Sequence, residues 1–378
     1  MDLDNKGFKF CPRKIIKVEY KGTNCPEARS GHRIVADNAN VYSFGGYNPD
    51  VDNADENYEN GLFKELWRFN IASKEWTNLR TKGQTPQLVA SHSAILLHHY
   101  LLVFGGTGVP FGFKNGNTLQ FYDIPNNCWK KVATSGSCPP KLYGQALALQ
   151  DDLLYVVGGT SGLDYFLDVH FLNLKTKQWE TLCAKEHPFG RYRHEIAIYK
   201  NKIYVFGGGT AIDSLELTQI PTFDLNTHKW ELVQTTGNTR TPHDMPCERK
   251  CHGCVQFDKD VYVFGGFTGR EILSDIWKMD LEIRQWTRYQ YELPETLYFH
   301  SVAAAPNGQV FIFGGIRSMF HKMRTNDMYT LWINIPTLKE ICWQAVLYYI
   351  PYLSKLPVEQ LLSIGIPNTF ISRLTLHC

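Results

Sequence analysis

"KIYVFGG", residues 202–208, is a short alternating apolar run that ends in two glycines. The same pattern occurs five more times in the chain, with successive first glycines 49 to 60 residues apart. The other copies are NVYSFGG (40–46), YLLVFGG (100–106), LLYVVGG (153–159), DVYVFGG (260–266) and QVFIFGG (309–315). Self-similarity at a period near 50 residues is typical of repeat architectures. The glycines are therefore interpreted together, as parts of one repeating unit.

Two further markers keep register with the glycine pairs. A histidine or glutamine lies 13 residues before the first glycine in five units and 14 residues before it in the sixth. These residues are His32, His92, Gln145, His194, His252 and His300. A tryptophan follows 21 to 31 residues after the first glycine in five of the units, as Trp76, Trp129, Trp179, Trp230 and Trp286. Three markers in phase over six copies exclude a chance similarity.

Each unit has the composition of β-strands. Its apolar runs are short, rich in Val, Ile, Tyr and Phe, and bounded by Gly, Asn, Asp or Pro. Four such strands in about 50 residues form the small twisted sheet of a propeller blade. Glycine suits the point where a strand leaves the crowded centre, because positive φ and the lack of a Cβ are needed there. A phosphate-binding loop would instead continue directly into a helix. Here another strand pattern follows, which argues against nucleotide binding.

This pattern resembles the kelch repeat over roughly residues 14–335, and the resemblance implies an all-β, six-bladed β-propeller. The sixth unit is incomplete, because NDMYTLWINIP (326–336) supplies a third strand and no Trp-terminated fourth strand follows. At the other end of the chain, RKIIKVEY (13–20) has strand character but no unit of its own. Because a propeller must close its ring and hide its sheet edges, we expect this N-terminal strand to complete the last blade. The expected parts are an extension (1–12), the propeller (13–335) and a C-terminal segment (336–378).

Composition bounds the classes of function. The chain has 378 residues, is 43% hydrophobic and carries a formal net charge of +2. A charge so nearly balanced argues against nucleic acid as the main partner. We expect no signal peptide at the N-terminus and no membrane span, because no stretch has 18 uncharged apolar residues. The ten scattered cysteines are expected to be free thiols in the cytoplasm or nucleus.

The C-terminal segment changes period after Pro336. Thr337 and Glu340 form the pattern of a capping box, and Leu338, Cys342 and Ala345 recur at helical spacing on one face. Prolines 351, 357 and 367 then divide the segment into short helices. Two interpretations stay open from the residues alone. The helices are either a cap packed on the propeller or a docking element for a groove in another protein.

A second resemblance concerns this segment. TLKEICWQAV (337–346) resembles the elongin-binding box, with Thr337, Leu338, Cys342 and Val346 at its characteristic positions. In that family the leucine enters a pocket of elongin C, and the small cysteine allows close helix approach. LPVEQLL (356–362) resembles a cullin-binding box through Leu356, Pro357 and Leu361, although Gln360 stands where an aliphatic residue is usual.

Together, the propeller and the box resemble the kelch-repeat substrate receptors of elongin BC–cullin–RING ubiquitin ligases. The resemblance implies a non-catalytic adaptor without a cofactor. Its implied partners are elongin B/C, a cullin–RING scaffold, and the C-terminal tails (C-degrons) of substrate proteins, including alanine-rich ones.

A chain terminus presents a carboxylate, which calls for arginine in a partly desolvated pocket. In kelch propellers the ligand face is built from loops just before the His-register strand and just after the glycines. The candidate peptide-binding residues on these loops are Arg29, Ser91, Tyr143, Arg191, Arg193, Arg249, Lys250 and Tyr298. Some of the cations in the fourth and fifth units would bind the carboxylate, and the two tyrosines would exclude large side chains. An alternative stays open for Arg29, Arg191 and Arg249. Each lies three residues before the register residue, where arginine often hydrogen-bonds within its own blade.

Other kinds of function have requirements that the sequence meets less well. Cys247, Cys251, His252 and Cys254 are close in sequence, but successive strand residues point to opposite faces, which disfavours a metal site. A scaffold that binds actin or a signalling kinase or phosphatase would use the propeller without the elongin box. A kelch oxidase would need copper ligands and a Tyr–Cys crosslink in a secreted chain, whereas a sugar mutarotase would leave the helical segment unexplained.

Overall fold

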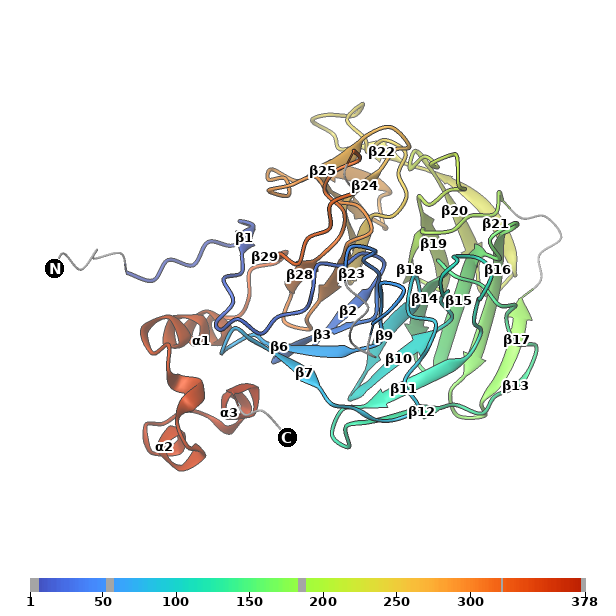
Figure 1. Ribbon diagram of the computed structural model, residues 1–378. Coiled ribbons are helices and arrows are strands. Elements are labelled where there is room, and N and C mark those ends of the chain that lie inside the picture. Colours follow the sequence, from blue (N-terminus) through green and yellow to red (C-terminus); the bar gives the residue numbers. More distant parts are fainter. Residues whose placement is uncertain (1–6, 52–57, 183–187, 321, 375–378) are drawn as a thin grey trace.

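The computed structural model describes residues 7–51, 58–182, 188–320 and 322–374. The first six residues of the expected N-terminal extension and the last four of the chain lie outside these ranges. Within them, six mainly antiparallel sheets are arranged in a ring (Figure 1), and their first strands line a central channel. The first strands of the six sheets follow one another around that channel, each beside the first strands of its two neighbours. The predicted six-bladed propeller is confirmed.

The blades are numbered in chain order, and each runs outward from the channel. Blade 1 contains β2 (Arg33–Ala36), β3 (Asn40–Phe44), β6 (Leu66–Asn70) and β7 (Glu75–Leu79). Blade 2 contains β9 (Ser93–Leu97), β10 (Tyr100–Phe104), β11 (Leu119–Asp123) and β12 (Cys128–Lys131). Blade 3 contains β14 (Ala146–Gln150), β15 (Leu153–Thr160), β16 (Tyr165–Asn173) and β17 (Gln178–Leu182).

The second half of the ring repeats this order. Blade 4 contains β18 (Glu195–Tyr199), β19 (Lys202–Phe206), β20 (Gln219–Asp224) and β21 (Lys229–Gln234). Blade 5 contains β23 (Gly253–Phe257), β24 (Asp260–Phe267), β25 (Ile272–Asp280) and β26 (Gln285–Arg288). Blade 6 contains β27 (Ser301–Ala304), β28 (Gln309–Phe313) and β29 (Met328–Trp332). Short outer strands β8 (Lys82–Gly83), β13 (Ser135–Gly136) and β22 (Thr236–Gly237) extend blades 2, 3 and 5, and β4 (Tyr58–Glu59) pairs with β5 (Leu62–Phe63).

The N-terminal strand closes the ring, as the incomplete sixth repeat predicts. β1 (Ile16–Lys17) pairs antiparallel with β29, with Ile16 opposite Thr330. Tyr20, just beyond β1, packs its ring edge-on against Phe69 and Trp76 of blade 1. One short segment thus completes the sheet of blade 6 and contacts blade 1.

The glycine pairs keep register with the histidines because the two motifs interlock between blades. A Cβ added to Gly207 of blade 4 would lie 2.9 Å from Cε1 of His252 in blade 5. A Cβ added to Gly208 would lie 2.6 Å from Cβ of His194 in its own blade. Both glycines also have positive φ, 54° and 83°. The pair is therefore needed where two adjacent blades meet at the channel.

The repeated tryptophans pack at the same junctions between adjacent blades, further from the channel. Each packs on the phenylalanine that precedes the glycine pair of the preceding blade, as Trp129 does on Phe44 with ring centroids 4.8 Å apart. The exception is Trp230, which packs on Phe223 of its own blade. Its neighbour, blade 3, carries Val157 where the other units have phenylalanine, so no aromatic partner is present there.

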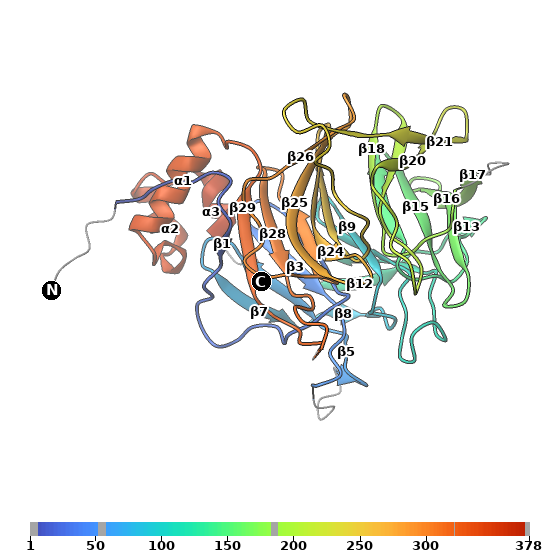
Figure 2. The ribbon, with the colours of Figure 1, turned by 90° about the horizontal axis from the view of Figure 1, so that it is seen from above.

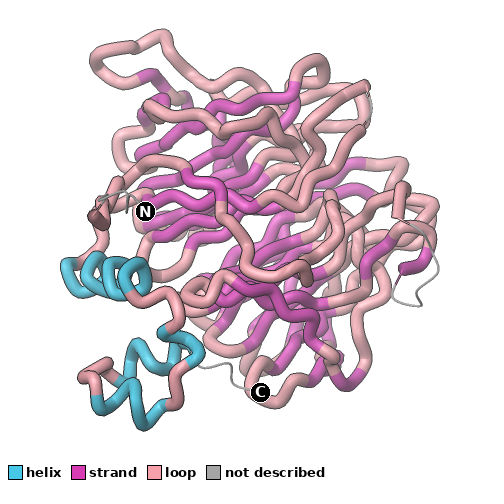
Figure 3. Tube along the Cα trace, turned by 60° about the vertical axis from the view of Figure 1, so that its left-hand side comes forward, coloured by secondary structure: helices cyan, strands magenta, loops and turns pink. Residues whose placement is uncertain are grey.

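The C-terminal helices lie beside blades 1 and 6, outside the ring (Figures 1 and 2). They are α1 (Leu338–Tyr349), the 3₁₀ turn η1 (Leu353–Lys355), α2 (Val358–Ser363) and α3 (Asn368–Leu374). Their boundaries follow the three prolines, as predicted. Figure 3 shows them gathered into one small cluster at the side of the strands. They have a core of their own, in which Trp343 stacks on Phe370 with centroids 4.5 Å apart.

The capping box at Thr337 forms only in part. The Thr337 hydroxyl accepts from the Glu340 amide at 3.4 Å, as expected for an N-cap. The Glu340 carboxylate instead accepts from both terminal nitrogens of Arg373, at 2.9 and 3.2 Å. Arg373 also donates to the carbonyl of Asn38, and Asn70 donates to the carbonyl of Arg373. This junction joins the helices to the end of blade 1 where β2 meets β3.

Candidate functional site

A closed ring of six backbone hydrogen bonds surrounds one end of the channel. In each blade the residue just before the register position donates its amide to the carbonyl of the equivalent residue in the preceding blade, at 2.7 to 3.1 Å. The six residues are Gly31, Ser91, Gly144, Arg193, Cys251 and Phe299, and we call them the mouth ring. All six have positive φ, between 54° and 67°. Four non-glycine residues in this region represent backbone strain of the kind that gathers at functional sites.

A pocket of about 420 Å³ lies on the mouth ring. It is formed by the loops that precede the first strands and the loops that follow the glycine pairs. Its walls are mainly aromatic. The lining side chains include Ser30, Tyr47, Ser91, Phe111, Tyr143, Tyr192, Arg193, Tyr298, Phe299, Ile316, Lys322 and Arg324. Aromatic walls with a few polar groups are typical of ligand pockets, and this one is at the small end of their size range.

Arg193 forms the floor of this pocket. Its side chain crosses the mouth ring, where one terminal nitrogen donates to Ser91 Oγ of blade 2. The guanidinium carbon lies 4.6 Å from the centroid of the Phe299 ring in blade 6. Arg193 is only 6% exposed, and its Nε is buried without a hydrogen-bond partner. Burial lowers the pKa of Arg193, but an arginine remains charged at neutral pH. The residues that line the pocket therefore include a buried cation with an unused donor.

Arg324 supplies a second cation at the wall. Its Nε donates to Ser30 Oγ at 3.0 Å, and its guanidinium lies 5.2 Å from the centroid of the Tyr47 ring. Burial lowers the pKa of Arg324 as well. Lys322 lies on the same loop. Among the described residues that line the pocket, none is acidic. The lining side chains thus carry a net positive charge, which suits an anion with an apolar body.

The channel below the mouth ring is crossed by an ion pair. Arg33 of blade 1 contacts Glu195 of blade 4, on the opposite side of the ring, at 2.7 Å. Both side chains are largely buried, at 14% and 17% exposure. The wider cavity at the other end of the channel is lined mainly by apolar residues of the first strands. The pocket and this cavity are therefore separated by Arg193 and the ion pair.

Three predicted arginines lie inside their blades and not in the pocket. Arg29, Arg191 and Arg249 each donate to the carbonyl of the first glycine in their own unit, at 3.0 to 3.1 Å. Arg29 also pairs with buried Glu65 at 2.5 Å. The residue three positions before the register position points into the blade, whereas the residue one position before it joins the mouth ring.

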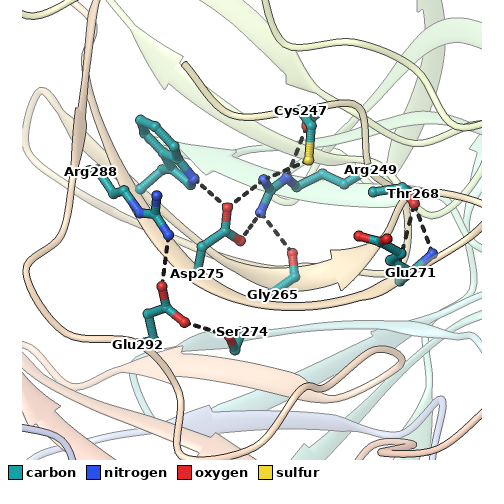
Figure 4. A network of polar contacts seen from close by, with 10 residues as sticks. Cys247, Arg249, Gly265, Thr268, Glu271, Ser274, Asp275, Arg288 and Glu292 are labelled. Carbon is teal, nitrogen blue, oxygen red and sulfur yellow. Dashed lines mark hydrogen bonds and ion pairs between the residues drawn. The ribbon is translucent and has the colours of Figure 1, made fainter. Parts of the chain in front are cut away.

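Figure 4 shows this arrangement for Arg249 in blade 5. Its guanidinium donates to both carboxylate oxygens of Asp275, at 2.7 and 3.0 Å, and to the carbonyl of Gly265. Burial alone would raise the pKa of Asp275, yet the hydrogen bonds and charge of Arg249 hold it below its ordinary value. Arg249 has no exposed surface, so its donors serve the blade.

Lys250 is also engaged internally. Its ammonium donates to the carbonyls of Thr210, Ala211 and Asp213, at 2.7, 3.2 and 3.3 Å. Burial lowers the pKa of Lys250, which is only 4% exposed. Its charge therefore stabilises the loop that follows the glycine pair of blade 4.

The structure brings together four of the eight predicted peptide-binding residues, namely Ser91, Tyr143, Arg193 and Tyr298. Sequence reasoning missed Phe299 and Arg324. Phe299 occupies the same position relative to its register residue as Arg193 does, and this shared spacing is the signal that could have found it. Arg324 lies at the far end of the loop that follows the glycine pair of blade 6, just before the third strand, where the repeat offered no comparable signal.

The residues of the predicted elongin and cullin boxes differ in accessibility. Leu338 is 75% exposed, and Cys342 is also exposed. Val346 and Leu356 pack against the helical core. Leu361 lies in that core at 1% exposure, whereas Pro357 is exposed just before α2. The face bearing Leu338 and Cys342 is thus free for contact, while Leu361 stabilises the helices.

In the described ranges, no three His, Cys, Asp or Glu side chains are arranged to hold a metal ion. Every described cysteine is a free thiol. No helix described here is long and apolar enough to cross a membrane.

The fold and the repeated motifs define the chain as a kelch-repeat β-propeller protein. The family described as the KLHDC2/KLHL20/DRC7 Kelch-repeats domain matches residues 8–208 and 182–346. Propellers of this class are generally non-catalytic scaffolds or adaptors, and no enzyme family is indicated.

Individual relatives narrow this assignment. Kelch domain-containing protein 10 of Xenopus tropicalis is 42% identical over 96% of this chain and 90% of that protein. The protein of the same name in Homo sapiens is 41% identical, over 96% of this chain and 84% of that protein. A Drosophila melanogaster homologue is 35% identical over 97% of this chain and 66% of that protein. The chain belongs to the Kelch domain-containing protein 10 family.

Proposed function

We propose that this chain is the substrate-recognition subunit of a cullin–RING ubiquitin ligase. The pocket on the mouth ring would bind the C-terminal tail of a substrate, and the C-terminal helices would bind elongin B/C and a cullin. The pocket and the helices lie at opposite ends of blade 1. Ser30 and Tyr47 line the pocket at one end, and Asn38 and Asn70 contact the helices at the other.

The single observation that carries the peptide-binding half is Arg193. This lining residue is only 6% exposed and its Nε has no hydrogen-bond partner, so most of the desolvation cost of its charge is met before any ligand arrives. A carboxylate placed there gains charge-assisted hydrogen bonds in surroundings of low dielectric. A chain end carries such a group and no bulky continuation beyond it. Tyr143 and Tyr298 narrow the pocket walls, which favours small terminal residues such as alanine.

The test is binding of a fluorescent peptide that ends in Ala-Ala, measured by polarisation. We expect Arg193→Met to weaken binding at least ~30-fold, as loss of a buried charged hydrogen bond costs about 2 kcal/mol or more. Amidating the peptide should weaken it similarly. Arg240→Met removes an exposed arginine outside the pocket and serves as the control. Equal binding of the amide and the free acid would refute the carboxylate site.

The ligase half is supported by the exposed face of α1. Co-purification of the chain with elongins B and C should be lost in Leu338→Ala/Cys342→Phe, because both side chains are accessible and neither stabilises the helical core. If the intact chain itself does not bind the elongins, the ligase role is refuted, and the chain is a kelch scaffold whose C-terminal helices have another role.

A further inference from the structure

Strongly exposed apolar side chains lie on loops at the end of the propeller that holds the pocket. Among the described residues, the four most exposed large apolar side chains are 84 to 95% exposed. They are Phe113, Leu163, Ile212 and Phe320, and we call them the apolar rim. Each lies on the loop that follows the glycine pair of a different blade, namely blades 2, 3, 4 and 6. Isolated exposed apolar residues are normal, but four on corresponding loops at one end of the propeller are not a random scatter.

The loops that carry the rim contact one another in succession. Asn115 of the blade 2 loop donates to the carbonyl of Ser161 in the blade 3 loop at 2.7 Å. The Tyr165 hydroxyl at the end of that loop accepts from the amide of Ala211 in blade 4, also at 2.7 Å. The wall continues to blade 1, where Tyr47 packs edge-on against Phe111. Arg324 of the blade 6 loop lies over the Tyr47 ring, so the loops that carry the four rim residues form one connected wall.

Internal hydrogen bonds hold the backbone of two of the rim loops, those that carry Leu163 and Ile212. Buried Thr160 accepts from the amide of Gly162, next to Leu163, at 3.0 Å. Thr210 accepts from the amides of Ile212 and Asp213, at 3.2 and 3.0 Å, and Lys250 binds three carbonyls of the same loop. The backbone of these two loops therefore loses little further freedom on binding.

The direction in which a bound peptide runs indicates what would cover the rim. A peptide whose terminal carboxylate lies at Arg193 must leave the pocket through its mouth, because the channel below is closed by Arg193 and the Arg33–Glu195 pair. An extended chain advances ~3.3 Å per residue, so the residues just before the tail must pass the rim loops. On this basis, which rests on the proposed function, we infer that the apolar rim binds an apolar segment of the substrate immediately before its C-terminal tail. The recognised signal would then have two parts, a small carboxylate terminus and an apolar stretch preceding it.

The experiment compares three free-acid peptides by fluorescence polarisation. One is the tail alone, of about four residues. The other two add about eight residues before it, either apolar (Leu and Phe) or polar (Ser and Asn). We expect the apolar extension to tighten binding about tenfold relative to the polar one, since burying one large apolar side chain gives at least that factor.

Matched variants assign the effect to the rim. Phe113→Ser/Leu163→Ser/Ile212→Ser/Phe320→Ser should bind the tail alone as the wild type does but lose the preference for the apolar extension. Leu232→Ser/Ile283→Ser changes exposed apolar residues elsewhere on the propeller, at 59% and 57% exposure, and should keep it.

The possible failures are distinguishable. Carboxylate-dependent binding of the tail with equal affinity for both extensions would overturn the rim inference and leave the proposed function standing. Binding of the tail that is independent of its carboxylate would overturn the proposed function. Rim-dependent binding to phosphatidylcholine vesicles, or rim-dependent self-association in sedimentation, without a peptide preference would show that the surface has a different occupant.

Discussion

The register histidines define the chemistry of the propeller at the residue scale. His92, His194 and His300 are enclosed where blades meet, and burial lowers the pKa of His92 and His194 to about 3 and that of His300 to about 4. Burial also lowers the pKa values of His32 and His252. These side chains are therefore neutral in the folded protein at any ordinary pH.

Stability should consequently fall in acid. The folded pKa values lie below the unfolded value of ~6.5, so the unfolded chain binds more protons below that pH. The contribution of each histidine is present in full above pH ~6.5 and is lost as pH falls toward the folded pKa. His194→Gln should reduce the dependence of unfolding free energy on pH by up to ~1.4 kcal/mol per pH unit between about pH 6 and 4.

Glutamine is a suitable replacement because blade 3 already uses it. Gln145 donates to the carbonyl of Phe104, the residue before a glycine pair, and His194 Nε2 contacts the equivalent carbonyl of Val157 at 3.1 Å. Urea unfolding at a series of pH values measures the effect. An unchanged slope in the variant would show that His194 does not take up a proton on unfolding.

The arginines three residues before the register position, Arg29, Arg191 and Arg249, are expected to affect stability and not binding. Arg249→Met would leave the carboxylate of Asp275, 15% exposed, without its cation. Breaking such a pair costs about 3 kcal/mol or more, and Asp275→Asn in the same chain should recover part of it. Thermal melting and peptide affinity are measured on the same samples. Weaker binding without destabilisation would instead place Arg249 at the ligand.

At the scale of elements, the strands could be predicted because the same strand pattern occurs in six copies of the repeat. The site was predictable only in part. The distinction between Arg191, which lies in its blade, and Arg193, which lies on the pocket floor, depends on the left-handed turn of the mouth ring. The propensities of arginine, serine, cysteine and phenylalanine do not predict positive φ, so this turn could not be predicted from the residues that form it. Similarly, α2 is too short for its apolar spacing to show that Leu361 faces inward.

The helical cluster should behave as a separate packing unit. Trp343→Ala removes the side chain that stacks on Phe370, and a loss of this kind costs about 3 kcal/mol or more. We expect the segment after Pro336 to become sensitive to limited proteolysis while the melting temperature of the propeller changes little. Leu338→Ala, on the exposed face of α1, should leave proteolysis unchanged. An equal loss of propeller stability would show that the cluster and the ring unfold together.

At the scale of the whole molecule, the pocket depends on closure of the ring. Tyr298, Ile316 and Arg324 come from blade 6, whereas Ser30 and Tyr47 come from blade 1. The Arg324–Ser30 hydrogen bond and the Arg324–Tyr47 contact therefore span the junction between the last and the first blade. That same junction is held together by β1, which pairs with β29 and is followed by Tyr20 against Phe69 and Trp76.

Removing residues 1–20 should therefore weaken both stability and the site. Because β1 and Tyr20 supply pairing and packing worth roughly 5 kcal/mol, we expect the melting temperature to fall by ~10 °C and tail-peptide affinity to fall with it. A synthetic peptide of residues 9–24 should bind the open blade and restore both in proportion to its concentration, since a ligand of the folded state stabilises it by mass action. A peptide with the same residues in scrambled order is the control. Full stability and affinity in the truncated chain would mean that the ring closes without its N-terminal strand, and that the pocket is assembled by the loop contacts alone.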